Sequence, residues 1–388
     1  MNKPNTVIVS LAVLAAVCAA FWLLLAAPAM TGNAINMPVG VTPQSVSHYE
    51  LHMTILWICI VIGILVFTAM FTSIVLHRKS RNHEPAGFSH STKAEIAWTI
   101  IPVMILIGMA IPATTALIKM EDTSGSDMTV KITGFQWKWK YDYLDEDISF
   151  ISSLKADSNA ARQLNSGIDP EDVENYLLDV DKPLVLPVGK KVKFLITADD
   201  VLHAWWVPEF GWKRDAIPGF INEAWVIIEK PGTYRGQCAE LCGKDHGFMP
   251  IVVIALAEAE YQQWLDRQKN AGRAEAELIL QQWDMQGLMQ RGKDVYAGQC
   301  ATCHQIDGSG LAPAFPALAG SEVATGPLED NILLVVNGVE GTAMQGWGNL
   351  LSPVDIAAVL TYMRNSFGNA SGDLVQPELV VSLKGDEL

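Results

Sequence analysis

The chain is poor in histidine and cysteine, and the few that it has are clustered. Eight histidines and six cysteines occur among 388 residues. Beyond residue 120 the only histidines are His203, His246 and His304. Four of the cysteines form two close pairs, Cys238/Cys242 and Cys300/Cys303. Because two of the three histidines lie beside a cysteine pair, the pattern indicates metal chemistry rather than a disulfide scaffold.

Basic side chains are also few. The chain has 27 lysines and arginines against 42 aspartates and glutamates, which gives a formal net charge of −15 at pH 7. This excess of negative charge excludes a general nucleic-acid binder and favours cationic partners.

Residues 1–29 have the pattern of a secretory signal peptide. Lys3 precedes an apolar run that ends in Ala27-Pro28-Ala29, and small residues of this kind are typical of a cleavage site. The apolar run is longer than in most signal peptides, so an uncleaved N-terminal anchor is the alternative.

Two later stretches, Met53–Leu76 and Ile96–Leu117, contain no charged residue. Each is long enough to cross a bilayer, which takes ~20 residues. The basic sequence between them, residues 77–81, is expected to remain in the cytoplasm. Residues 45–120 are therefore predicted to form a transmembrane hairpin, with everything after it exported. A buried helical hairpin is the alternative.

Residues 124–260 show the alternation and the Pro/Gly punctuation of short β-strands. At Gly134 the alternation shifts phase, which predicts a β-bulge. The polar segment 151–175 is expected to be a loop. Strands are expected at 184–186, 191–197, 224–228, 233–238 and 251–255, which together indicate a β-sandwich or barrel.

The remaining chain divides into three parts. Residues 261–286 belong to a stretch rich in good helix formers, which predicts a helical connector. Residues 287–368 combine helical patches with Gly/Pro-rich loops and form a separate domain. Residues 369–388 are expected to be a tail.

The second cysteine pair belongs to Cys300-Ala301-Thr302-Cys303-His304, the attachment motif for c-type haem. In such a motif both thiols form thioethers with the haem vinyl groups and the imidazole reaches the iron. A redox CxxC followed by an incidental histidine is the alternative. Met344 lies about forty residues after His304, in a segment that resembles the loop of the sixth ligand in small bacterial cytochromes c. His/Met ligation leaves no open position on the iron and favours electron transfer.

The first cysteine pair lies in a segment that also supplies an imidazole and a thioether. Cys238, Cys242, His246 and Met249 fall within twelve residues, and His203 lies upstream. Two cysteines and two histidines would also satisfy a tetrahedral zinc ion. The methionine favours copper, because thioether and thiolate donors combined with imidazole suit that metal.

The copper segment and its surroundings resemble a known family. Three segments, Ala198–His203, Lys213–Gly219 and Gln237–Met249, resemble the binuclear copper A domain of cytochrome c oxidase subunit II. The resemblance extends over roughly residues 45–260, and the fused haem domain makes the chain similar to caa-type oxidases. It implies a transmembrane hairpin, a cupredoxin-like Greek-key β-sandwich at 124–260 and an all-α class I cytochrome c domain at 287–368.

The resemblance also implies a role for each copper ligand. In the family both cysteines bridge two copper atoms, each copper gains one histidine, and a methionine and a backbone carbonyl are weaker ligands. These roles fall on Cys238, Cys242, His203, His246, Met249 and the carbonyl of Glu240.

Two further residues carry over from the resemblance. Trp137, after Gln136, matches the aromatic element through which electrons reach copper A, although an exposed tryptophan could simply pack against the haem domain. Glu95, at the cytoplasmic start of the second span, matches a carboxylate at the mouth of a proton pathway into subunit I. A helix N-terminal acid favoured by the helix dipole is the alternative for Glu95.

The function implied is that of subunit II of a proton-pumping cytochrome c oxidase in the bacterial inner membrane, with both redox domains on the periplasmic side. The implied partners are subunits I and III, an external cytochrome c or a cytochrome bc complex, and membrane lipid. The chain has no second set of haem ligands and no catalytic motif, so oxygen reduction is expected in subunit I.

Three alternative functions differ in what they require of the copper site. The electron-accepting subunit of a copper-containing nitric oxide reductase is the main alternative, because it can share the same module. A quinol oxidase subunit would lack the copper ligands. A copper-delivery protein would need an exchangeable, exposed site, which two bridging thiolates within a sandwich do not provide.

Overall fold

The computed structural model describes residues 8–21, 36–81, 87, 89–163 and 166–385. The chain separates into two compact units. The first comprises residues 1–122 with Pro208–Trp212, and the second comprises Thr123–Val207 with Lys213–Leu388. The predicted signal cleavage site at Ala27–Ala29 lies outside the described residues.

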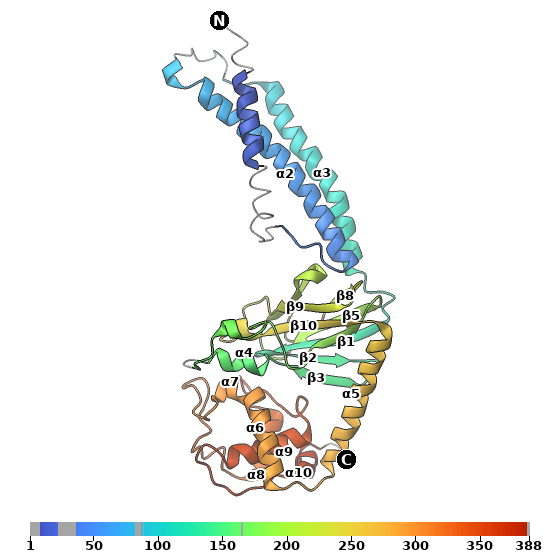
Figure 1. The fold of residues 1–388 in the computed structure, drawn as a ribbon, viewed down its shortest axis with the longest axis vertical. Coiled ribbons are helices and arrows are strands. Elements are labelled where there is room, and N and C mark those ends of the chain that lie inside the picture. The colour runs from blue at the N-terminus through green and yellow to red at the C-terminus, as the bar shows by residue number, and fades with distance from the viewer. Residues whose placement is uncertain (1–7, 22–35, 82–86, 88, 164–165, 386–388) are drawn as a thin grey trace. The chain divides into compact units, whose positions relative to one another are not determined.

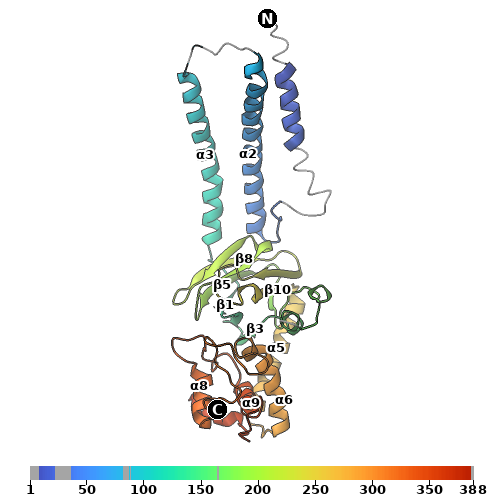
Figure 2. The same cartoon turned by 90° about the vertical axis from the view of Figure 1, so that its left-hand side faces the viewer.

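The first unit consists of apolar helices. A helix at Ile8–Phe21 is followed by α2 (Pro43–Leu76) and α3 (Thr92–Glu121), and α2 and α3 lie next to each other (Figures 1 and 2). Both are long and apolar enough to cross a membrane. They contain the two predicted spans, and α2 begins ten residues before the first of them. The basic loop includes a short 3-10 helix, η1 (Lys79–Arg81).

The start of α2 is fixed by its cap and by the segment 208–212 of the same unit. The Thr42 hydroxyl accepts a hydrogen bond from Ser45 N and donates one to Phe210 O, both at 3.0 Å. His48 Nδ1 lies 2.8 Å from Gly211 O. Gly211 has a φ of +82°, and a Cβ there would lie 2.6 Å from Ser45 Cα, so only glycine allows this close approach.

The second unit begins with a β-sandwich, as predicted. One sheet has the order β3-β2-β1-β5-β8 and another has the order β4-β10-β9, while β6 and β7 form a two-stranded ribbon. The strands are β1 (Met128–Phe135), β2 (Lys138–Tyr143), β3 (Ile148–Ser152), β4 (Leu184–Pro187), β5 (Lys191–Ala198), β6 (His203–Val207), β7 (Trp212–Ala216), β8 (Asn222–Ile227), β9 (Gly232–Gln237) and β10 (Pro250–Leu256). The pairs β1/β5 and β4/β10 are parallel, and the pairs β1/β2, β2/β3, β5/β8 and β9/β10 are antiparallel.

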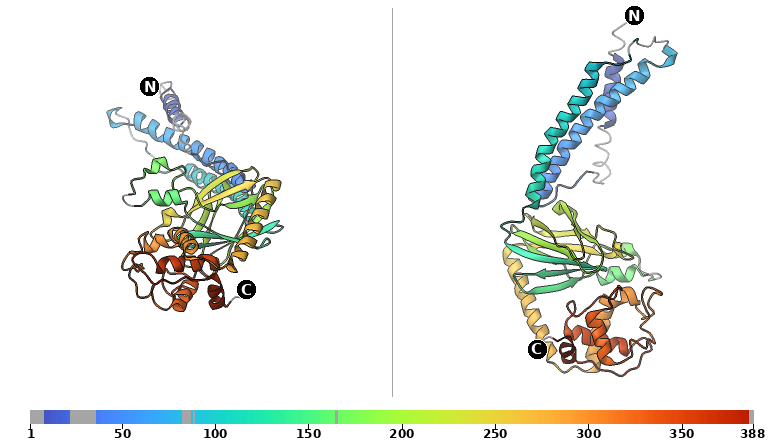
Figure 3. Two further views of the ribbon diagram at one scale, coloured as in Figure 1. Left: turned by 60° about the horizontal axis from the view of Figure 1, so that its bottom comes forward. Right: turned by 180° about the vertical axis from the view of Figure 1, so that it is seen from behind.

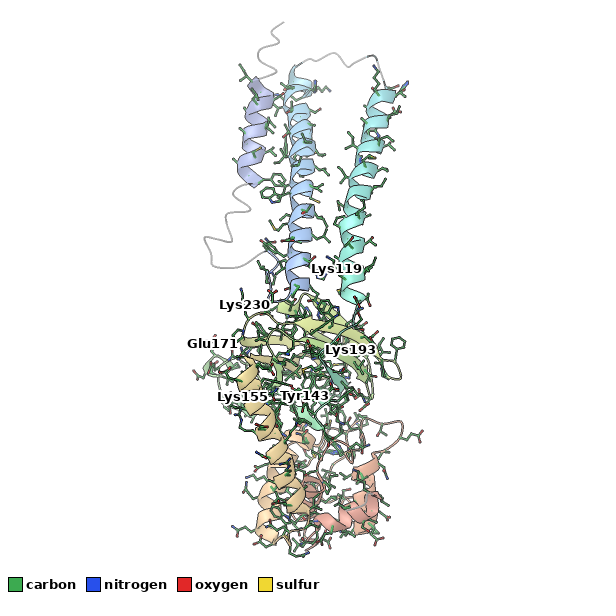
Figure 4. All side chains as sticks on the ribbon, turned by 90° about the vertical axis from the view of Figure 1, so that its right-hand side faces the viewer. Lys119, Tyr143, Lys155, Glu171, Lys193 and Lys230 are labelled. Atoms are coloured by element: carbon green, nitrogen blue, oxygen red, sulfur yellow. The ribbon has the colours of Figure 1, made fainter. Side chains whose placement is uncertain are left out.

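Alternation along β2 places its aromatic side chains in the core. Trp139, Tyr141 and Tyr143 are buried, and Figure 4 shows Tyr143 among the strands. The Tyr143 hydroxyl donates to Val185 O at 2.8 Å. This hydrogen bond links the five-stranded sheet to β4 of the other sheet.

The predicted bulge at Gly134 is wrong. The phase shift arises because β1 and β2 are two antiparallel strands joined at Gln136-Trp137, and Gly134 pairs with Trp139 in regular register. A Cβ on Gly134 would lie 3.0 Å from both His203 Cδ2 and Trp139 Cζ3. Glycine therefore provides room for the imidazole of a predicted copper ligand.

The expected loop at 151–175 is only partly correct. Its first residues complete β3, and the segment also contains α4 (Ala156–Ala161) and the 3-10 helix η2 (Pro170–Asp172). Strands β6 and β7, and the 3-10 helices η3 (Pro208–Phe210) and η4 (His246–Phe248), were not anticipated. They are short and follow polar or turn-forming residues, so periodicity gives little signal for them.

The C-terminal region is helical. Helix α5 (Glu258–Ile279) runs from the sandwich toward α6 (Figure 3). It is followed by α6 (Met285–Val295), a π-helical turn η5 (Tyr296–Cys300), α7 (Ala301–His304), α8 (Leu328–Asn337), α9 (Pro353–Arg364) and α10 (Pro377–Lys384). Helices α6 and α9 cross so closely at Gly292 that a Cβ there would lie 2.0 Å from Ala358 O.

Two predicted boundaries in this region need correction. The connector is not one helix through residue 286, because α5 ends at Ile279 and α6 starts anew after the Asp284 cap, whose side chain accepts from Gly287 N at 2.8 Å. The expected tail at 369–388 includes α10, whose Val380 belongs to the same buried cluster as α9. The domain that contains the haem motif thus extends beyond residue 368.

Candidate copper and haem sites

One end of the sandwich brings together the six predicted copper-binding residues. His203 is the first residue of β6, and Cys238 follows directly after β9. Strands β9 and β10 are paired at Gln237 and Pro250, so the segment between them closes at this end. The Cys238 amide donates to Met249 O at 3.0 Å, which brings the two ends of the ligand loop, residues 238–249, together.

The donor atoms of this site lie close together. Cys238 Sγ and Cys242 Sγ are 3.8 Å apart. His203 Nδ1 lies 3.9 Å from Cys238 Sγ, and His246 Nδ1 lies 3.4 Å from Cys242 Sγ. The donors of His203, Cys238 and Cys242 all fall within 4.8 Å of one another, and His246 approaches from the Cys242 end. The Glu240 carbonyl lies 3.4 Å from Cys238 Sγ, and Met249, the last residue of the loop, is buried.

Hydrogen bonds tune the acidity of these donors. The hydrogen bond shared by the two thiols lowers the pKa of Cys238 and raises that of Cys242. Burial alone would lower the pKa of His203, but hydrogen bonds to Asp200 and Cys238 more than offset this effect, and its pKa is raised. One thiolate is therefore already favoured before any metal binds.

Asp200 is a supporting residue that sequence reasoning did not single out. Its carboxylate accepts from His203 Nε2 at 3.0 Å and from Gln136 N at 2.7 Å. It thus orients Nδ1 of His203 toward the thiols. The available signal was its position three residues before a predicted ligand.

Trp137 lies against the ligand loop. It is buried, whereas one interpretation of the sequence took it to be an exposed tryptophan. Its indole Nε1 donates to Cys242 O at 3.1 Å, and Gln136 Nε2 donates to the same carbonyl at 2.9 Å. Only 6% of Trp137 is accessible to solvent. Gly243 follows with a φ of +116°, and a Cβ there would lie 2.9 Å from Gln136 Nε2.

The four predicted haem-binding residues line one cavity of about 370 Å³, a volume typical of cofactor sites. They are Cys300, Cys303, His304 and Met344. His304 Nδ1 donates to Pro316 O at 2.9 Å, which leaves Nε2 as the free acceptor. Met344 is held by a hydrogen bond of 2.7 Å from Val339 N to its own carbonyl. The cavity thus offers two thiols, an imidazole nitrogen and a thioether.

Residues of the β-sandwich contribute to the same cavity, and apart from Trp137 sequence reasoning did not anticipate them. Trp137, Lys138, Arg162 and Phe248 are among its lining residues. Arg162 pairs with Asp245 at 3.1 Å and lies 4.4 Å from the ring centre of Phe248. No local motif identifies these residues, because they reach the cavity only through the packing of the second unit.

Glu95 lies in the first turn of α3, and its Oε1 accepts from Ser91 N at 3.3 Å. A carboxylate that caps the start of a helix makes a contact of this kind. The contact therefore agrees with the alternative given above for Glu95, a helix N-terminal acid. The proton-uptake role stays a prediction.

Three family models match consecutive parts of the chain. Residues 30–115 match the transmembrane domain of cytochrome c oxidase subunit II, residues 128–256 match its periplasmic domain, and residues 287–363 match subunit III of cbb3-type cytochrome c oxidase. The third match falls on the region that carries the haem motif.

Curated relatives and a solved structure are similar to part of this chain. A probable cytochrome c oxidase subunit 2 of Rickettsia bellii is 39% identical over 218 residues, which cover 56% of this chain and 76% of the relative. The subunit 2 of Cereibacter sphaeroides is 36% identical over 57% of this chain and 77% of its own length. The crystal structure of the periplasmic domain of subunit II from Bradyrhizobium japonicum is 39% identical, covers 38% of this chain and 98% of that one, and has a TM-score of 0.34.

The fold and the two sites define a membrane-anchored redox protein with copper-type and haem-type centres. The chain belongs to the cytochrome c oxidase subunit II family and carries a fused cytochrome c domain at its C-terminal end. It is therefore an electron-accepting subunit of a haem-copper oxidase that works with subunit I. It lies in the inner membrane with its sandwich in the periplasm. Its two redox domains imply copper A and haem c.

Proposed function

We propose that the chain takes electrons from an external cytochrome c or a cytochrome bc complex and relays them to subunit I, where oxygen is reduced and protons are pumped. One covalent haem c and one binuclear copper A centre would carry the electrons along this relay. The observation that carries the proposal is the position of Trp137, which lines the haem cavity and donates to the carbonyl of Cys242 in the ligand loop.

The copper donor set supports a binuclear centre more than a single zinc ion. A tetrahedral ion needs all four donors around one point. Here the donors of His203, Cys238 and Cys242 lie within 4.8 Å of one another, whereas His246 is not part of that group and its Nδ1 lies 3.4 Å from Cys242 Sγ. Cys238, Cys242, His203 and His246 would hold the two copper atoms, with the thiolates as soft donors. The Glu240 carbonyl and the Met249 thioether are the proposed weak ligands.

The haem assignment rests on donors that face one cavity. Cys300 and Cys303 are proposed to form the thioethers, and His304 and Met344 are the proposed axial ligands. The Pro316 carbonyl fixes the tautomer and ring orientation of His304 by accepting from Nδ1. Burial lowers the pKa of the His304 imidazole and so favours its neutral, ligating form.

The chain's own residues then hold the two sites in contact. Trp137 and Gln136 both donate to the Cys242 carbonyl, so the ligand loop and the cavity wall share one hydrogen-bonded corner. No residue of this chain is proposed to be catalytic for oxygen reduction. Subunit III and membrane lipid are the further proposed partners.

Metal and haem analysis of the purified complex tests the proposal. We expect two copper atoms and one covalent haem c for each copy of this chain. Cys238→Ser should abolish the mixed-valence copper spectrum while the haem stays attached. Stoichiometric zinc, or a haem that acid-acetone extracts, would contradict it.

Identification of the co-purifying catalytic subunit tests the partner. Mild-detergent purification should yield a haem-copper subunit that consumes oxygen. A catalytic subunit that instead reduces nitric oxide would support the alternative assignment to a nitric oxide reductase.

A further inference from the structure

The outer face of the β1–β2–β3 strands carries buried residues where a sandwich normally meets solvent. The core face of β2 holds Trp139, Tyr141 and Tyr143. Lys138 therefore points to the opposite face, together with its pairing partner Phe135. Ile151 lies on the same face, because it pairs with Lys140.

These three outer-face residues are nevertheless shielded from water. Phe135 is fully buried, and Lys138 and Ile151 are each 6% exposed. Apolar residues on an outer face, together with a lysine that is almost inaccessible, indicate a covered surface. We call Phe135, Lys138 and Ile151 the outer-face patch.

The covering comes from the cytochrome region of the same chain. Phe135 and Ile151 belong to one continuous buried cluster with Tyr296, Ile332 and Trp347. The rings of Phe135 and Trp347 meet edge-to-face, with their centroids 6.4 Å apart. The apolar core of the cytochrome region thus continues onto the outer face of the sheet.

Lys138 supplies the polar contacts of this surface. Its Nζ donates to the backbone carbonyl of Gln299 at 3.0 Å and to Gln299 Oε1 at 2.7 Å. The same ammonium lies 5.0 Å from the ring centre of Trp347, within reach of a cation–π interaction. Gln299 directly precedes the first haem-binding cysteine, so this contact positions the haem motif relative to Trp137.

We propose that the outer-face patch is a fixed docking surface for the chain's own cytochrome region, and that Lys138 is the positioning residue that sets its register. The inference rests on the proposed function and adds a geometric constraint to it. Haem-to-copper transfer takes place in one bound arrangement, and the cytochrome region does not sample many positions on its connector.

Occupation of the outer-face patch also limits where an external donor can bind. Trp137, next to Lys138, is almost inaccessible and lines the haem cavity. A soluble cytochrome therefore cannot dock over Trp137 while the cytochrome region occupies the patch. The external donor must bind the cytochrome region, and its electrons reach copper through the chain's own haem.

Lys138→Met in the complete oxidase is the main test, with Lys140→Met as the matched control. Lys140 lies two residues along the same strand and on the same face, but pairs with Asp142 at 3.2 Å. Methionine keeps the length and apolar stem of lysine but cannot donate to Gln299. Phe135→Ala removes the apolar contact to Trp347 without changing charge, and serves as a second variant.

Three measurements are needed on each variant: single-turnover haem-to-copper transfer, the haem midpoint potential, and amide hydrogen exchange of residues 133–140 and 296–304. We expect Lys138→Met and Phe135→Ala to slow transfer about tenfold or more and to raise exchange in both segments by a similar factor, because docking contacts are lost. Copper and haem content should stay normal, and Lys140→Met should match the wild type.

The inference would be overturned if Lys138→Met transferred electrons from haem to copper, and exchanged its amide hydrogens, at the same rates as the wild type. A slower transfer that the change in haem potential fully explains, with unchanged exchange, would also overturn it, because Lys138 would then act only through its charge. A wild-type protein that shows no haem-to-copper transfer at all would instead reject the proposed relay, so the two failures are distinguishable.

Discussion

Gly243 is the residue on which the contact between Trp137 and the ligand loop most directly depends. Its φ of +116° is disfavoured for residues with a side chain, and a Cβ would lie 3.2 Å from Trp137 Cζ2. Gly243→Ala is therefore expected to destabilise the exported part by about 1–3 kcal/mol and to slow haem-to-copper transfer.

Gly247→Ala is the matched control for this prediction. Gly247 lies in the same loop, but nothing lies within 4 Å of a Cβ built there. Denaturant titration and single-turnover kinetics should show little change for Gly247→Ala. Equal effects of Gly243→Ala and Gly247→Ala would mean that any substitution in the loop lowers stability and slows transfer. The effect of Gly243→Ala would then not depend on its contact with Trp137.

Met344 offers a second test at the level of a single residue. If its thioether is the sixth haem ligand, Met344→His should leave the haem attached and lower its potential, because a thioether favours ferrous iron more than imidazole does. Redox titration measures the change. Met285→His, at the start of α6, is the control, and an unchanged titration of Met344→His would mean that another residue is the ligand.

The hairpin β1–β2 is the element that connects both redox sites. Its turn carries Gln136 and Trp137, which contact the ligand loop, and its next residue is Lys138, which contacts Gln299. Burial lowers the pKa of Lys138 from 10.5 to about 8, and the nearby Cys300, Cys303 and Asp181 oppose this effect.

The lowered pKa predicts how docking depends on pH. Between pH 8 and pH 10.5, the undocked state, with Lys138 in water, binds more protons than the docked state. Docking should therefore become more favourable as pH rises through this range, by an amount on the order of 3 kcal/mol. Below pH 8 the dependence should vanish.

Amide exchange of residues 133–140 and 296–304, measured relative to Lys138→Met at each pH, checks this prediction. The ratio of the wild-type exchange rate to that of Lys138→Met removes the intrinsic pH dependence of exchange, which both proteins share. Identical pH profiles for the two proteins would show that Lys138 does not titrate at the interface.

At the scale of the whole molecule, substitution of Glu95 tests whether the chain also takes part in proton uptake by the oxidase. Its contact with Ser91 N is sufficient for a helix cap, so a purely structural role predicts that Glu95→Gln loses a little stability and no activity. If the side chain instead supplies protons to subunit I, steady-state oxygen consumption should fall while electrons still reach haem c and copper A at the normal rate.

Stopped-flow measurements on the assembled Glu95→Gln complex separate the two roles, with Glu95→Asp as the milder control. Copper and haem content must first be shown to be normal. Full turnover in Glu95→Gln would exclude the proton role and leave the cap.

Features that are local in the chain could be predicted from sequence alone. The haem motif and the ligand loop each gather their donors within a few residues, because adjacent thiols and imidazoles must reach one cofactor. The two spans follow from uninterrupted apolar stretches, and the longer strands follow from alternation. The assignment to subunit II rested on these local patterns, and the family matches confirm it.

Only the tertiary structure decided which distant residues meet. Lys138 and Gln299 are 161 positions apart, and Trp137 and Cys242 are 105 apart, and no periodicity encodes such pairs. The burial of Phe135 and Trp137, the clearance that Gly134 provides for His203 and the inclusion of α10 in the core all depend on strand register and domain packing. These contacts form between surfaces that come from distant parts of the chain. Patterns in the local sequence therefore cannot predict them.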